Sequence, residues 1–234
     1  AEAKTNLFYQ PKWKENVQGL NGYSAVQFDG YHNYMDINSL MIDSNMTVFI
    51  VCEGSKQTKN TASNHRPLLA SNNNPYRADS NGYGIGFKNL GLDGGFAVCC
   101  GKPGADPNDP NMIDELATTN GIKQGDGTFY VITVRKAGDN DSKLYCRSVS
   151  EVNNVLLSSN DPNSLTRTTG FHTGYQLAAD SDSPARHYRG NIAEIIIYNQ
   201  ALDDTRMATI NSYLYNKYSS LPVTEELVLW LDAS

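Results

Sequence analysis

The stretch YRGNIAEIIIYNQAL, residues 188–202, decides the fold class of this chain. Its centre, residues 191–198, is the strongest strand signal in the sequence because β-branched and aromatic residues dominate it. Residues 203–217 follow and predict the one amphipathic helix, which Asp203 or Asp204 can cap at its N-terminus. Its apolar side chains repeat at helical spacing on one face, so this face is expected to dock on the sheet: Met207, Ile210, Leu214 and Tyr218.

Short strand-like runs separated by turn-rich stretches occupy most of the chain before this stretch. The runs are residues 24–28, 34–37, 46–52, 68–70, 83–87, 95–100, 129–134 and 143–148. Residues 46–52 read as a central strand, and the last two runs flank a Gly/Asp/Asn turn and so predict a hairpin. Strands at such intervals are typical of an antiparallel sandwich rather than of alternating βαβ units. No internal repeat is present.

Length and composition fit one large β domain of 1–218, followed by 219–234 as a linker and an extra strand. No apolar run approaches the ~18 residues of a membrane span, so membrane insertion is not expected. The net charge is −6, and the basic residues are scattered singly. That pattern argues against a nucleic-acid partner, because phosphate binding needs clustered cations.

Three segments resemble the concanavalin A-like jelly-roll superfamily in its bacterial, laminin-G-like form. They are residues 21–36, with NGYSAVQFDG and then YMD, residues 47–51, and residues 188–202. The resemblance implies a two-sheet antiparallel jelly-roll sandwich with one C-terminal amphipathic helix. It also implies a lectin-like or adhesion module of a secreted, cell-surface or particle-surface protein.

The C-terminal residues 227–234, LVLWLDAS, look like the first strand of this family placed last. Three explanations remain open. The segment begins a further repeat of a longer protein, fills a first-strand position in its own domain, or is donated to a neighbouring copy. An open sheet position beside 191–198 would expose unpaired backbone groups and apolar side chains, which favours a filled position.

Carbohydrate binding is the chemistry that the polar loops support best. Sugar recognition needs flat aromatic faces together with amide, carboxylate and guanidinium groups that hold hydroxyls. Two stretches offer this mixture, one over residues 72–79 and one beginning at residue 172. The candidate ligand-binding residues are Asn72, Asn74, Tyr76, Arg77, Asp79, His172, Tyr175, Arg186 and His187.

Catalytic patterns are not evident. Retaining glycosidases place two carboxyl groups about 5.5 Å apart, and no E-x-D-x-E triplet occurs here. Glu194 is interpreted as a structural carboxylate near the helix. A His, Arg and Tyr mixture could serve a polysaccharide lyase, but ordinary polar surface is the preferred interpretation. The expected function is therefore a non-catalytic carbohydrate- or surface-binding module, with a structural assembly module as the alternative and a lyase or hydrolase third.

Metal and cysteine chemistry stay open at this point. The resemblance implies a Ca²⁺-ligating Asp where this chain has Ala193, so calcium at that position is doubtful. Asp-rich turns at 106–109, 139–141 and 180–182 could supply oxygen ligands for Ca²⁺. The cysteines lack C-x-x-C spacing, and buried free thiols are the favoured interpretation for Cys52, Cys99, Cys100 and Cys146.

Overall fold

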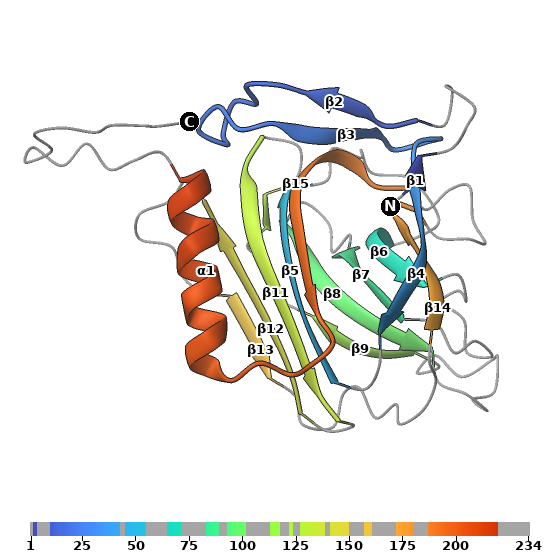
Figure 1. Cartoon of the computed structure of the whole chain (residues 1–234), viewed down its shortest axis with the longest axis vertical. Coiled ribbons are helices and arrows are strands. Elements are labelled where there is room, and N and C mark those ends of the chain that lie inside the picture. The colour runs from blue at the N-terminus through green and yellow to red at the C-terminus, as the bar shows by residue number, and fades with distance from the viewer. Residues whose placement is uncertain are drawn as a thin grey trace, which may run out of the picture.

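A computed structural model describes thirteen parts of the chain. They are residues 2–3, 10–42, 45–54, 65–71, 83–88, 93–101, 113–117, 122–123, 127–138, 141–149, 157–160, 172–179 and 187–219. The described strands form two antiparallel sheets that face each other, with one helix against the outer face of one sheet (Figure 1). This is the two-sheet jelly-roll sandwich with a C-terminal helix that the sequence predicts.

The first sheet has eight strands in the order β1-β4-β14-β6-β7-β8-β10, with β9 also paired to β8. Their bounds are β1 Glu2–Ala3, β4 Met35–Ile42, β14 His172–Leu177, β6 His65–Ser71, β7 Tyr83–Lys88, β8 Asp93–Gly101, β10 Ile122–Lys123 and β9 Ile113–Ala117. Strands β7 and β8 coincide with the predicted runs 83–87 and 95–100, and they pair antiparallel along their length. Position 86 has room only for glycine, because a Cβ there would lie 2.3 Å from the carbonyl oxygen of Arg66.

The second sheet has seven strands in the order β13-β12-β11-β5-β15-β3-β2. Their bounds are β13 Leu157–Asn160, β12 Asp141–Ser148, β11 Phe129–Ala137, β5 Asn45–Glu53, β15 Arg189–Tyr198, β3 Ala25–Asp29 and β2 Lys12–Lys14. Strand β5 is central, as predicted, since it pairs with β11 on one side and β15 on the other. The predicted hairpin is the β11–β12 pair.

Helix α1, Asp204–Tyr218, packs on the outer face of this second sheet. Its N-cap is Asp203, whose carboxylate accepts a hydrogen bond from the backbone N–H of Arg206, at 2.8 Å. Of the predicted apolar face, Met207, Leu214 and Tyr218 are buried and Ile210 packs beside them. The helix is too short and polar to cross a membrane, and no other helix occurs in the described parts.

Two apolar clusters pack against the second sheet, one on each of its faces. The inner cluster fills the space between the sheets and includes Phe28, Ile50, Ile132 and Tyr188. The outer cluster lies under α1 and includes Phe49, Val51, Leu202 and Leu214. Because neighbouring residues of a strand point to opposite faces, β5 contributes Met46, Val48, Ile50 and Cys52 to the inner cluster and Phe49 and Val51 to the outer one.

Two of the four cysteines have described side chains, and both are free and buried: Cys52 and Cys146. Burial raises the pKa of each thiol well above its usual range, so both stay neutral at pH 7. This confirms the favoured interpretation for these two residues. The side chains of Cys99 and Cys100 lie outside the described part of the structure.

Candidate functional site

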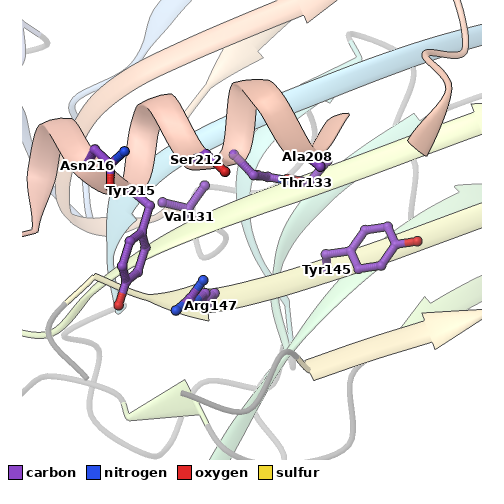
Figure 2. A pocket seen from close by; sticks show the side chains of 9 residues that line it. Val131, Thr133, Tyr145, Arg147, Ala208, Ser212, Tyr215 and Asn216 are labelled. Atoms are coloured by element: carbon purple, nitrogen blue, oxygen red, sulfur yellow. The ribbon is translucent and has the colours of Figure 1, made fainter. Parts of the chain in front are cut away.

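A groove of about 500 Å³ runs between helix α1 and the hairpin of β11 and β12 (Figure 2). Residues from both strands form one side and residues from the helix the other. They are Val131, Thr133, Tyr145, Arg147, Ala208, Asn211, Ser212, Tyr215 and Asn216. The groove thus lies on the outer face of the second sheet, away from the core between the sheets.

Strand alternation explains the sheet side of the groove. In β12 the buried and partly exposed positions alternate along the whole strand, which puts Tyr145 and Arg147 on the face turned toward the helix. In β11 the residues paired directly with them are Thr133 and Val131. The hairpin register therefore sets an aromatic ring and a guanidinium group beside a hydroxyl and an apolar side chain.

The helix side of the groove follows from the way α1 is anchored. Its apolar face holds the sheet, and Thr133 Oγ1 donates a hydrogen bond to Asn211 Oδ1 at 2.6 Å. Positions 208, 211, 212, 215 and 216 recur at spacings of three and four, so they lie on one side of the helix. This side of the helix borders solvent, and it presents two amides, a hydroxyl and the Tyr215 ring to the groove.

Arg147 is the charged residue among the nine that line the groove. Its guanidinium carbon lies 3.9 Å from the centre of the Tyr215 ring, within cation–π distance. Its Nε is buried and has no hydrogen-bond partner. Within the described parts of the chain, Arg147 has no carboxylate at salt-bridge distance.

The two other cations of this face are already paired. Arg135 contacts Asp141 at 2.9 Å, and Lys143 contacts Asp204 at 2.9 Å. The hydrogen bond between Lys143 and Asp204 raises the pKa of the lysine and lowers that of the aspartate. Arg147 is therefore the cation on the outer face of β11 and β12 that has a ring but no counter-charge, as far as the described residues show.

The chemistry available in the groove is recognition of a polar, planar-faced ligand. Tyr145 and Tyr215 offer rings, Arg147 offers a planar set of donors, and Asn211 and Asn216 offer amides. None of the nine lining residues is an Asp, Glu or His. The lining itself therefore supplies no carboxyl pair of the kind that glycoside hydrolysis needs.

Nine residues were predicted from sequence to bind a ligand, and the structure describes the backbone of three of them. Asn72, Asn74, Tyr76, Arg77, Asp79 and Arg186 fall outside the described residues. The backbone of His172 belongs to β14, where it pairs with Ile42, and its side chain is not described. The turns at 106–109 and 180–182, proposed for Ca²⁺, are also outside the described residues, and Asp141 of the third turn pairs with Arg135.

Tyr175 and His187 are described, and both are buried. Tyr175 is 0% exposed and belongs to the inner core, so in this conformation its ring offers no face to a surface ligand. His187 is 7% exposed, and its ring lies edge-on to Tyr34 at 6.3 Å. Neither lines the groove, so a ligand-binding role for the loop set remains a prediction.

Glu194 has the structural role expected from sequence. Its carboxylate accepts hydrogen bonds from Lys217 Nζ at 3.0 Å and from the Tyr218 hydroxyl at 2.8 Å. Burial opposes the charged form of Lys217, but the hydrogen bond to Glu194, the charges of Tyr218 and Glu194 and a hydrogen bond to Tyr213 together outweigh it and raise the lysine pKa. Together these contacts tie the end of α1 to β15.

A buried carboxylate, Glu53, escaped the sequence analysis. It is 1% exposed, and its Oε2 accepts a hydrogen bond from Asn191 Nδ2 at 2.6 Å. The Tyr188 hydroxyl donates to the Glu53 carbonyl at 2.7 Å. This cluster ties the end of β5 to the start of β15. No group of three or more His, Cys, Asp or Glu side chains that could hold a metal occurs in the described parts of the chain.

Comparison with solved structures shows the fold at low sequence identity. Tailspike protein 2 of bacteriophage CBA120, in its enzymatically active domain, matches with a TM-score of 0.60 and 11% identity over 93% of this chain and 30% of that one. The K499G mutant of NanB sialidase from Streptococcus pneumoniae matches with 0.51 and 18% over 79% and 27%. A GH54 α-L-arabinofuranosidase matches with 0.54 and 12% over 90% and 44%.

These matches establish a β-sandwich and no more, since their sequence identities are very low. The chain spans between about a quarter and under half of the length of these three proteins. No protein-family model and no curated protein sequence matches the chain.

Proposed function

We propose that this sandwich is a non-catalytic carbohydrate-binding module of an extracellular, cell-surface or particle-surface protein, in the manner of the laminin-G-like modules it resembles. The groove between α1 and the β11–β12 hairpin is its binding site. The observation that carries the proposal is the convergence of Tyr145, Tyr215 and Arg147 in one groove that contains no carboxylate. Two of the matched structures, a sialidase and an α-L-arabinofuranosidase, are enzymes of carbohydrates by their names, and they support the ligand class.

The unpaired guanidinium narrows the ligand. A planar guanidinium forms two parallel hydrogen bonds with a carboxylate, and it also holds neighbouring sugar hydroxyls. Acidic oligosaccharides, with a uronic or sialic acid unit, therefore fit the groove better than neutral ones. The tyrosine rings add stacking faces for the sugar rings.

The test is titration of the whole chain with acidic and neutral oligosaccharides by isothermal calorimetry. Arg147→Ala should weaken binding of the acidic sugar at least about tenfold, since a hydrogen bond to a charged group contributes about 1.5–3 kcal/mol. Tyr145→Ala should weaken it by up to about tenfold, since a stacked ring contributes about 0.5–1.5 kcal/mol. Arg147→Lys keeps the charge and loses the planar fork, so its affinity for the acidic sugar should lie between that of the wild type and that of Arg147→Ala. Tyr31→Ala, which removes a ring 62% exposed and outside the groove, is the matched control.

Other outcomes would redirect the proposal. Binding that survives Arg147→Ala and is lost on Tyr76→Ala or Arg77→Ala would move the site to the loop predicted from sequence. Release of new reducing or unsaturated ends from a polysaccharide would replace binding with catalysis.

A structural assembly module is the second candidate, and one observation favours it. In the described structure, residues 194–198 of β15 have a strand partner on one side only. An edge of this kind can accept a strand from a neighbouring copy. Light scattering over a hundredfold range of concentration tests it, because a strand-exchanged assembly gains mass as concentration rises and a monomeric binding module does not.

A further inference from the structure

Strand β15 changes from an inner strand to an edge strand part of the way along. From Arg189 to Ile192 it pairs with β3 on one side, and from Ile192 to Tyr198 it pairs with β5 on the other. Beyond Ile192 no described strand pairs with the side of β15 that faces away from β5. Alternate backbone N–H and C=O groups on that side therefore have no ladder partner among the described strands.

Burial along β15 changes at the same point. Gly190, Asn191 and Ile192 are buried, whereas every residue of 193–198 is partly exposed, on both faces of the strand. Simple alternation would expose only one face. Exposure of both faces is what the loss of a neighbouring strand produces.

The inner core is incompletely covered on the same side. Five apolar side chains pack against the inner cluster but remain partly exposed: Val26, Met35, Ile37, Ile195 and Ile197. They come from β3, β4 and β15, and Ile195 and Ile197 belong to the part of β15 that has a strand partner on one side only. The uncovered surface is therefore apolar, and it runs along the free edge of β15.

One segment of this chain fits that edge in length and chemistry. Residues 227–231, Leu-Val-Leu-Trp-Leu, are a continuous apolar run that belongs to none of the described strands. As a strand, it would turn Leu227, Leu229 and Leu231 to one face and Val228 and Trp230 to the other. A strand apolar on both faces suits a position beside β15, which contacts the inner cluster on one face and the outer cluster under α1 on the other.

The tether is long enough for this segment to reach the edge within the same molecule. Helix α1 ends on the same sheet, with Ser219 as its C-cap. The seven residues between Ser219 and Leu227 span at most about 25 Å when extended. That length is about equal to the length of the 15-residue helix, roughly 22 Å, which itself runs along the sheet.

We propose that residues 227–231 dock in cis along residues 193–198 of β15 and complete the second sheet. The added strand supplies partners for the free backbone groups of β15. It also covers the partly exposed isoleucines at positions 195 and 197. The interaction is independent of the groove, so its failure would leave the proposed sugar binding unaffected.

Hydrogen–deuterium exchange of the full chain tests the proposal directly. Those amides of residues 193–198 that point away from β5 should exchange at least about tenfold faster in Leu229→Asp than in the wild type, because the charge removes the strand that protects them. Thr224→Asp, which adds the same charge outside the apolar run, is the matched control and should leave exchange unchanged. Both proteins should have the mass of a monomer at all concentrations.

A second measurement needs no disruptive change in the strand. The chain has two tryptophans, and Trp13 is 65% exposed, so Trp13→Phe isolates Trp230. Docked, Trp230 should emit at shorter wavelength and resist quenching by iodide, and Leu229→Asp should reverse both effects. Fully quenchable emission together with fast exchange at 193–198 would overturn docking. Protection that disappears on dilution, with a mass above that of the monomer, would overturn the cis arrangement in favour of donation between copies.

Discussion

Strands β5 and β15 are neighbours with similar sequences and different surroundings. Both are rich in β-branched aliphatic residues, two valines and one isoleucine in β5 and four isoleucines in β15, and they pair with each other over six positions. Yet β5 is buried at every position after Asn45, whereas β15 is partly exposed from Ala193 onward. The difference is the number of neighbours, because β5 lies between two long strands and β15 has only the short β3 on its second side. Exposure here is set by pairing and not by composition.

The largest expected effect compares one isoleucine from each strand. Ile50→Ala should lower the free energy of unfolding by about 2–5 kcal/mol, because Ile50 is completely buried and the cavity cannot be filled by solvent. In a Leu229→Asp background, where the edge of β15 is open, Ile197→Ala should lower the free energy of unfolding by clearly less than Ile50→Ala does. Urea denaturation midpoints, read at constant m-value, measure both.

Equal losses at the two positions in that background would break the comparison. They would mean that another part of the chain covers β15 in solution. Tyr31→Ala, at an exposed turn, should stay within about 0.5 kcal/mol of the wild type and serves as the reference.

The next effect concerns the polar cluster that joins β5 and β15 where both are buried. Asn191→Leu should destabilise the protein by about 1–3 kcal/mol, because the buried Glu53 carboxylate loses the hydrogen bond from Asn191 Nδ2. Adding Glu53→Gln to this variant should recover part of the loss, since losing the hydrogen bond from position 191 costs a buried neutral amide less than a buried carboxylate. Urea denaturation of the two variants and of Glu53→Gln alone provides the measurement, and additive losses would show that the two side chains are not coupled.

The smallest expected effect is a pH dependence at the end of β3, the strand that covers the start of β15. Burial alone would raise the pKa of Asp29, but hydrogen bonds from the backbone N–H groups of His32, Tyr31 and Asn33 outweigh it, and the pKa is lowered. A lowered native pKa stabilises the fold above the unfolded value of about 3.9, and this contribution is lost as pH falls through the native value. Asp29→Asn should therefore be less stable than the wild type at pH 7, and the gap should narrow below about pH 4.

Urea midpoints between pH 7 and pH 3 measure this narrowing. His32→Gln is the control for the nearby imidazole, whose Nδ1 lies 3.6 Å from Asp29. A gap that narrows only when His32 is present would show that His32, and not the backbone, holds the Asp29 charge.

Local pattern was sufficient for the elements that carry their own signal. The helix at 203–217 could be predicted because its cap and its apolar spacing lie within a few residues, and α1 begins and ends within one residue of that range. The hairpin of β11 and β12 could be predicted because its turn residues fix the register. The structural role of Glu194 also followed from its position before the helix.

The groove could not be predicted in the same way. Tyr145 and Arg147 alternate with buried Leu144 and Cys146, so the sequence does show that they share a face. It does not show that Tyr215, some 70 residues later, meets Arg147 across the groove. Likewise Tyr175 looked like a loop residue available for stacking, but its strand places it in the inner core. Contacts between distant segments depend on how the sheets are ordered, and local pattern does not encode that order.

By itself, then, the sequence determined nine of the fifteen described strands, the helix and which of their faces are apolar, because these properties depend on the spacing of side chains within a single segment. Only the tertiary structure decided that β5 is enclosed and β15 is partly open, that α1 closes a groove over β12, and that Arg147 meets a ring and no carboxylate there. These properties depend on which strands lie side by side. In a sheet, the neighbour of a strand often comes from a distant part of the chain, as β15 does for β5.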